Sequence, residues 1–227
     1  MITGALVNAA AILVGGSIGL LLKGKISDKF TQGIIRALGL CVFVIGTYGA
    51  ISGDIMLLVV SLALGTFAGE FIRIDEHLSN LGLWAQSKFS SGDDNSTFAE
   101  GFVTATLLFC VGAMAIVGSI DAGLRNEYDV IFTKSIIDGV TAMIFASSLG
   151  VGVLFSAPVI LIYQGIIEFF ASYLQDVFTP GLITQISAVG GVMLLAIGLN
   201  MSINAKIKAA NMLPAFIFAI AYYFLFN

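Results

Sequence analysis

The sequence predicts an all-α polytopic membrane protein with about eight transmembrane helices, built as a 3+3 inverted-topology repeat plus two C-terminal helices. Three observations predict this class. Of the 227 residues, 58% are hydrophobic and only 11% are charged; several long stretches contain no Asp, Glu, Lys or Arg; and motifs of the first half recur in the second. A bilayer-spanning helix needs about 20 mostly apolar residues. A chain of this size has too little polar surface to enclose so many apolar runs in water.

In chain order, the helices are expected at 3–22, 33–52, 54–72, 98–120, 134–155, 157–175, 183–203 and 211–226. The first is expected to be a retained helix, because Lys23 and Lys25 follow its apolar run instead of preceding it. The charge-free run 139–167 is expected to break at Ser156-Ala157-Pro158, since proline removes a helix donor and restrains the residue before it. The break predicts a tight helical hairpin.

Between the third and fourth helices, the segment 73–97 changes character. Ile74, Leu78 and Leu81 recur at helical spacing, and a Ser/Gly/Asp-rich stretch follows. This pattern predicts an interfacial amphipathic helix and a flexible cytoplasmic loop. A solvated helix that leads into the next span fits the same pattern equally well.

The positive-inside rule gives an orientation. Eight basic residues beside helix ends lie on one side of the predicted helices. This side is therefore expected to be cytoplasmic, which leaves both termini outside. The eight residues are Lys23, Lys25, Lys29, Arg36, Arg73, Lys88, Lys206 and Lys208.

The repeat is visible in paired motifs. "FTQGIIRA" at 30–37 aligns with "FTKSIIDG" at 132–139, and "GALVNAAAILVGG" at 4–16 aligns with "GFVTATLLFCVGA" at 101–113. Two copies of three helices, at 1–72 and 98–176, must be inverted because three is odd, and 177–227 adds two helices. Inverted repeats are common in transporters, whose sites lie near the midplane.

Small residues predict close helix packing. Gly15-x3-Gly19 and Gly65-x3-Gly69 have the spacing that lets helix backbones approach in lipid. Packing within the chain is the simpler interpretation, and a homo-oligomer interface is the alternative.

The sequence contains no pattern typical of an enzyme, a cofactor site or a nucleic-acid reader. It lacks a phosphate-binding loop, a zinc helix and a nucleophile elbow, and it has one histidine and two cysteines. We therefore expect no enzyme activity, no cofactor, no metal and no nucleic-acid partner. The expected partners are the lipid bilayer and an unidentified small solute or ion.

Polar groups inside the predicted spans are the candidate functional residues, because ionisable side chains are costly there. Glu168 is expected near mid-bilayer, about 16 Å into its predicted helix at 1.5 Å per residue, with Gln164 one turn before it. The pair predicts a cavity lining; a protonated Glu168 bonded to a neighbouring helix is the alternative.

Asp138 is expected about one turn inside its helix, where local pairing with Lys134 would explain it. Asp138 also aligns with Arg36 in the repeat, so the two could act as matched gates. Glu70 is expected near the inner end of its helix, beside Arg73. Asn8 in the first span needs a partner across helices and is expected mainly to join them.

The predicted helix 183–203 carries Gly190-Gly191 and Gly198, then Asn200 and Asn204. The glycines either allow close packing or loosen the helix, and the asparagines could satisfy carbonyls freed by a break. Asn204 fits a cytoplasmic helix end, which leaves Asn200 as the candidate ligand.

Long motifs such as "GALVNAAAILVGGSIG", "FTKSIIDGVTAMIFASSLGVGVLFSA" and "ISAVGGVMLLAIGLN", with "NMLPAF" near the end, resemble the YqgA/YdfK-like family of bacterial inner-membrane proteins, a domain-of-unknown-function group. The resemblance covers essentially the whole chain and implies a multi-pass protein of the bacterial cytoplasmic membrane with a presumed transport function. The polar positions that match are Asn8, Asp121, Asp138, Gln164 and Asn200, with Pro214. Glu168 lies outside the matching motifs and ranks below Asp138, Gln164 and Asn200.

The preferred prediction is a small secondary transporter or channel for a small solute or ion. Asn8, Asp138, Gln164, Asn200 and Glu168 are the candidate ligands; the candidate gating or structural residues are Arg36, Glu70, Asp121, Gly190, Gly191 and Gly198. The alternative is a membrane scaffold or regulator that acts through the loop at 74–100. A membrane enzyme ranks third, because the sequence shows no nucleophile and base.

Overall fold

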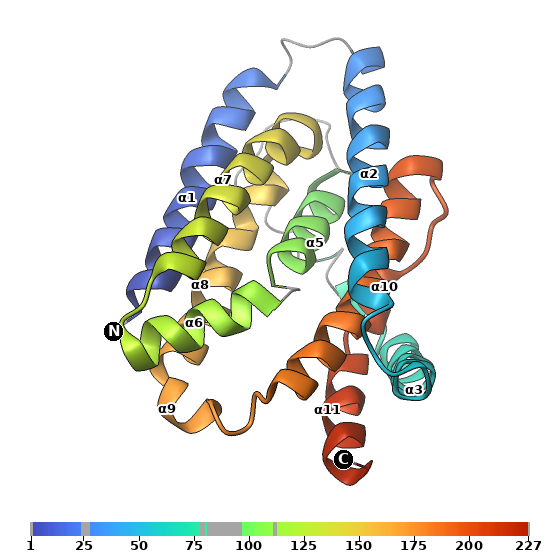
Figure 1. The fold of residues 1–227 in the computed structure, drawn as a ribbon. Helices are drawn as coiled ribbons and strands as arrows, with labels where there is room; N and C mark the ends of the chain where they lie inside the picture. The colour runs from blue at the N-terminus through green and yellow to red at the C-terminus, as the bar shows by residue number, and fades with distance from the viewer. Residues whose placement is uncertain (1, 24–27, 78–79, 81–96, 111–112, 227) are drawn as a thin grey trace. The chain divides into compact units, whose positions relative to one another are not determined.

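The computed structural model describes the whole chain except residues 1, 24–27, 78–79, 81–96, 111–112 and 227 (Figure 1). The described residues are mostly helical and contain no strand. The α-helices are α1 (Thr3–Leu22), α2 (Asp28–Ala50), α3 (Ile55–Ile72), α5 (Thr97–Cys110), α6 (Ala113–Arg125), α7 (Asp129–Leu149), α8 (Ser156–Phe169), α9 (Ala171–Leu174), α10 (Pro180–Ile203) and α11 (Ala215–Phe226). Two 3₁₀ segments lie between helices: η1 (Gly150–Phe155) follows α7 and precedes α8, and η2 (Ala209–Met212) lies between α10 and α11.

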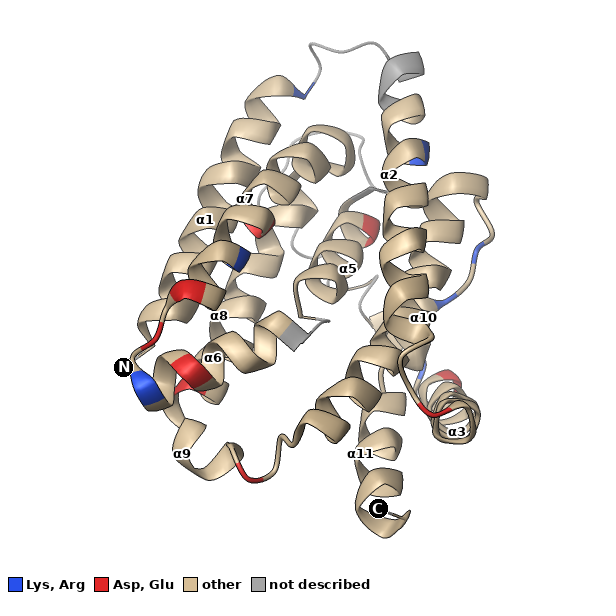
Figure 2. Ribbon diagram, viewed as in Figure 1, with Lys and Arg blue, Asp and Glu red and all other residues tan. Residues whose placement is uncertain are grey.

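The helices have the length and surface of a polytopic membrane protein. Six helical stretches of the described chain are long and apolar enough to cross a membrane, or seven if the bent pair α5–α6 forms one span. Even the count of seven is one below the predicted eight, because α7, η1 and α8 form one 41-residue stretch. Large apolar side chains lie exposed along these helices, as lipid-facing positions require, among them Leu21, Phe71, Ile136 and Ile203. Figure 2 shows that α1, α10 and α11 carry no charged residue.

The chain forms two compact units, each made of segments distant in sequence. Unit 1 contains residues 1–35 and 82–177, and unit 2 contains 36–81 and 178–227. The first helix therefore packs with helices of the second predicted copy. The repeat itself is a relation between sequence segments, and it stays a prediction. Of the predicted segment 73–97, residues 74–77 are helical, and most of the rest lies outside the described residues.

Unit 1 is organised around α1, which packs along α7 and α8. The helices α1 and α7 run in the same direction, because Gly4 meets Ile131 near their starts and Gly19 meets Met143 further along (Figure 1). A Cβ at Gly15 would lie 2.0 Å from the carbonyl oxygen of Gly139. The backbones thus touch at this predicted small-residue motif, which packs within the chain.

The hairpin between α7 and α8 turns at Gly150, earlier than predicted. Gly150 has a φ of 82°, a left-handed conformation that glycine adopts without strain, and it ends α7. Pro158 lies in the first turn of α8, where its missing N–H disrupts no helical hydrogen bond. The prediction of a break at Ser156-Ala157-Pro158 was therefore wrong in position.

The predicted helix 98–120 is also two helices. The axes of α5 and α6 differ by 58°. In unit 1, α6 packs on α8, and a Cβ at Gly123 would lie 2.0 Å from the carbonyl oxygen of Glu168. Close backbone contact therefore recurs at this second helix pair.

Unit 2 is held by glycine contacts and an apolar core. A Cβ at Gly46 of α2 would lie 2.6 Å from the carbonyl oxygen of Gly191 in α10, and one at Gly69 of α3 would lie 1.9 Å from that of Asn211. The core contains Leu57, Leu58, Ala188, Val189, Ala215 and Ala219. Capping fixes the helix starts: Asp54 accepts a hydrogen bond from Leu57 N–H, and Thr179 accepts one from Leu182 N–H ahead of Pro180.

Candidate functional site

Three helices of unit 1 bring three of the predicted site residues together. The Nδ2 of Asn8 in α1 donates to Asp138 Oδ2 in α7 at 3.0 Å and to Gln164 Oε1 in α8 at 3.0 Å. Asn8 and Gln164 are 0% exposed, and Asp138 is 4% exposed. Asn8 is therefore the point at which α1, α7 and α8 are joined by polar contacts.

Lys134 completes this group, and we call Asn8, Lys134, Asp138 and Gln164 the polar cluster. The Nζ of Lys134 donates to Asp138 Oδ2 within an ion pair of two buried side chains. The ammonium group also lies 5.9 Å from the centre of the Phe109 ring of α5, within cation–π range. Lys134 was not predicted as a site residue, although its position four residues before Asp138 was a signal for the pair.

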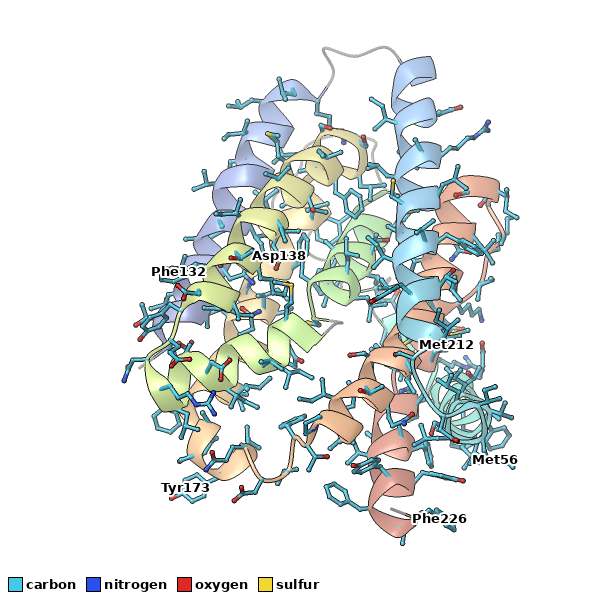
Figure 3. All side chains as sticks on the ribbon, in the orientation of Figure 1. Met56, Phe132, Asp138, Tyr173, Met212 and Phe226 are labelled. Atoms are coloured by element: carbon cyan, nitrogen blue, oxygen red, sulfur yellow. The ribbon has the colours of Figure 1, made fainter. Side chains whose placement is uncertain are left out.

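Asp138 lies deeper along its helix than the sequence indicated. Because α7 begins at Asp129, Asp138 lies about 14 Å along a helix of about 31 Å, at 1.5 Å per residue. Figure 3 labels Asp138 among the helices of unit 1. The prediction of Asp138 one turn inside its helix was wrong, because the helix begins at Asp129 and the charged Lys134 is paired inside it and does not mark its end.

Glu168 lies in the last turn of α8, because the helix ends at Phe169 and not at 175 as predicted. Its Oε1 and Oε2 accept hydrogen bonds from the N–H groups of Gly4 and Ala5, each at 2.9 Å. Ile2, at the N-cap of α1, makes no side-chain cap. The buried Glu168 carboxylate thus satisfies first-turn donors of α1 and faces the positive end of its helix dipole.

Two atoms of the polar cluster lack hydrogen-bond partners. They are Asn8 Oδ1 and Gln164 Nε2, each buried among described residues and without a partner there. Buried polar atoms are paired in the great majority of cases, so an unpaired acceptor and an unpaired donor on two hydrogen-bonded amides indicate a place for a further group.

The candidate gating residues at the helix ends make local contacts. In unit 1, Arg125 donates to Asp121 Oδ1 at 3.0 Å. In unit 2, Glu70 pairs with Lys208 at 3.6 Å and not with the expected Arg73, whose partner is Glu76 at 3.7 Å.

Arg36 belongs to unit 2, and its side chain is exposed. Its carbonyl accepts a hydrogen bond from Ser202 Oγ at 3.3 Å. Gating by Arg36 together with Asp138 stays a prediction, since the two residues belong to different units.

The helix α10 is continuous through Gly190, Gly191 and Gly198. Gly198 lies against Gly39 and Phe43 of α2, as Gly191 lies against Gly46, so these two glycines serve close packing. The sequence left open whether this helix is broken, and in the structure it is unbroken.

Asn200 belongs to unit 2, whereas the residues of the polar cluster belong to unit 1. Its Nδ2 donates to the Ile207 carbonyl at 2.7 Å, and its Oδ1 accepts from Ile207 N–H at 2.8 Å. Asn204 ends α10 in the left-handed conformation, with its N–H bonded to the Asn200 carbonyl. The Asn200 amide therefore folds the segment after α10 back onto the helix.

The described residues hold no group of three His, Cys, Asp or Glu side chains that could bind a metal ion. What the polar cluster offers is hydrogen bonding around one internally balanced ion pair.

Comparison with known proteins gives a family and no activity. Residues 3–224 match the family described as "Protein of unknown function (DUF554)". The uncharacterized membrane protein YdfK of Bacillus subtilis (strain 168) is 33% identical over 218 residues, covering 93% of this chain and 91% of YdfK. The uncharacterized protein YqgA of Escherichia coli (strain K12) is 30% identical over 223 residues, covering 96% of this chain and 95% of YqgA. No solved structure matches the chain.

Proposed function

We propose that this chain, which belongs to the DUF554 family and has a membrane protein among its matched relatives, is a small secondary transporter or channel. In this proposal it moves a small solute or ion across the bacterial cytoplasmic membrane. The polar cluster is the basis of this proposal. The supporting observation is a buried group of amides and charges midway along α7, among helices whose outer faces are apolar. Ionisable side chains at such depth are costly and are typical of transport pathways.

The unpaired atoms favour transport over a purely structural role. A cluster that only joins helices gains most when every buried donor and acceptor is paired. Here Asn8 Oδ1 and Gln164 Nε2 remain unpaired, so the cluster retains hydrogen-bonding capacity. In the proposal, Asp138 with Lys134 responds to the ion or proton, and the two amides contact the solute.

The predicted repeat is consistent with this site. Asn8 belongs to the first predicted copy, whereas Asp138 and Gln164 belong to the second, and inverted-repeat transporters hold their ligands where the copies meet. We keep the inverted repeat as part of the proposal.

The test is flux through purified protein in liposomes, with ion gradients and a panel of solutes. We expect flux above that of empty liposomes, and loss of most of it in Asp138→Asn, which removes the charge that Lys134 pairs with. Asp129→Asn, an exposed position in the first turn of the same helix, is the matched control and should keep wild-type flux. Equal flux in all three proteins and in empty liposomes would refute the transport proposal.

Orientation forms a separate part of the proposal. We propose that both termini lie outside the cytoplasm, on the basis of the eight basic residues expected inside. A C-terminal alkaline phosphatase fusion should then be active in cells, and a C-terminal green fluorescent protein fusion should be dark. The opposite pattern would reverse the topology and leave the polar cluster unchanged.

A further inference from the structure

The two unpaired atoms of the polar cluster have a defined chemical identity. An Asn or Gln amide can be turned over to exchange its oxygen and nitrogen, so each orientation must follow from its partners. Asn8 Nδ2 faces two acceptors, Asp138 Oδ2 and Gln164 Oε1. Turning the Asn8 amide over would place its oxygen against the Asp138 carboxylate, and this repulsion fixes Oδ1 as the unpaired atom.

The orientation of Gln164 follows from that of Asn8. With Asn8 Nδ2 donating, Gln164 must present its oxygen, which leaves Nε2 and its two N–H groups unpaired. A chain of contacts from Lys134 to Asp138 to Asn8 to Gln164 therefore leaves one free acceptor on Asn8 and one free donor on Gln164.

The charge balance of the cluster indicates what those atoms can bind. Lys134 and Asp138 form a buried ion pair, so the cluster carries no net charge. An added cation or anion would bring an unbalanced charge into a desolvated site, which is costly inside a membrane protein. A neutral molecule adds no such cost and can satisfy both unpaired atoms.

Resting on the transport function proposed above, we propose that the solute bound by the polar cluster is a small, uncharged molecule that donates a hydrogen bond to Asn8 Oδ1 and accepts one from Gln164 Nε2. The two amides are themselves joined by a 3.0 Å hydrogen bond, so both unpaired atoms belong to one hydrogen-bonded pair of side chains. The ion pair orients the amides and is not displaced by the solute.

The experiment is stopped-flow light scattering of proteoliposomes with water, urea, formamide and glycerol as neutral probes. Na⁺, K⁺ and Cl⁻ fluxes are measured in parallel with fluorescent indicators. We expect faster entry of at least one of the three neutral solutes than in empty liposomes, and ion fluxes at background. Gln164→Met keeps a similar volume but removes the donor and also the oxygen that accepts from Asn8 Nδ2. Entry should fall roughly tenfold, the factor given by the one hydrogen bond that the solute loses. Gln175→Met, the same change at an exposed position of unit 1, should leave entry unchanged.

Each other outcome overturns the inference in a distinguishable way. Ion flux without neutral-solute flux leaves the transport function standing and removes the neutral substrate class. Water permeation alone assigns the two atoms to an ordered water. Absence of all flux removes both proposals. Gln164→Glu, which keeps an oxygen for Asn8 and replaces the donor, serves as a second variant. If neither variant is monodisperse, the selectivity of the wild-type protein decides the proposal.

Discussion

Unit 1 and unit 2 are both built from apolar helices in close contact, yet they bury different chemistry. Backbone meets backbone at Gly15 and Gly139 in unit 1, and at Gly46 and Gly191 in unit 2. Among the described residues, every buried ionisable side chain lies in unit 1; these are Lys134, Asp138 and Glu168. Unit 2 shows that this chain packs membrane helices without buried charge.

The difference separates what folding requires from what function adds. A buried ion pair contributes little more to stability than well-packed apolar side chains of the same size, because desolvation offsets the attraction between the charges. The charges of unit 1 are therefore not explained by packing alone. The following predictions test this contrast, in order of decreasing effect on stability.

Breaking the ion pair should have the largest effect. Lys134→Met leaves Asp138 charged and unpaired in the interior, and we expect it to lower the free energy of unfolding by about 3–5 kcal/mol. The double variant Lys134→Met/Asp138→Leu should recover most of that loss and still lack flux. Unfolding in detergent measures stability, and liposome flux measures function.

A matched control exists in the same unit. Arg125 and Asp121 form an ion pair with the same four-residue spacing, but their side chains are 59% and 19% exposed. Arg125→Met should change stability by less than about 1 kcal/mol. If Lys134→Met were equally mild, or if the double variant kept full flux, the contrast between the units would lose its functional meaning.

Glu168 should rank second. Glu168→Gln keeps one acceptor for α1 but places an NH₂ group against a backbone N–H, so we expect a loss of about 1.5–3 kcal/mol. Hydrogen exchange should speed up at Gly4 and Ala5 in particular. Glu127→Gln, at an exposed position of unit 1, is the control. Unchanged exchange at the start of α1 would show that Glu168 does not hold it.

The glycine contacts of unit 2 should come third. Gly46→Ala places a methyl group 2.6 Å from the Gly191 carbonyl oxygen and should destabilise the protein by about 1–3 kcal/mol. Gly33→Ala in the same helix meets nothing within 4 Å and should instead stabilise it by up to about 1 kcal/mol, through helix propensity. Thermal unfolding of both variants checks the pair. Equal effects would mean that α2 and α10 do not touch as described.

The sequence predicted helix existence better than helix depth. The first helix was predicted at its observed bounds, Thr3–Leu22, because no charge interrupts it. For α7 and α8, charges and proline are poor guides to the helix ends. They predict Asp138 near a helix end and Glu168 well inside its helix, whereas Asp138 lies midway along α7 and Glu168 lies in the last turn of α8. From the sequence, a charged residue that is paired inside a helix, as Lys134 is, cannot be distinguished from a charged residue at a helix end.

The sequence could not predict which polar residues contact one another. Asn8, Asp138 and Gln164 were candidates because each is polar within an apolar run, and the structure joins all three. Asn200 was a candidate on the same ground, and it lies in the other unit. Residue type alone does not distinguish an amide that faces other helices from one that binds its own following backbone.

Asn200 provides the smallest and most discriminating prediction. Asn200→Ala removes both hydrogen bonds to Ile207; because both are only part-buried, water can replace them, and we expect a loss of about 0.5–1 kcal/mol in all. We expect a modest fall in thermal stability and faster tryptic cleavage at Lys206 and Lys208, because the segment after α10 is no longer held to the helix. A variant with normal stability and normal cleavage but lost flux would return Asn200 to the transport path. That result would also end the contrast between the units, because it would give unit 2 a polar site of its own.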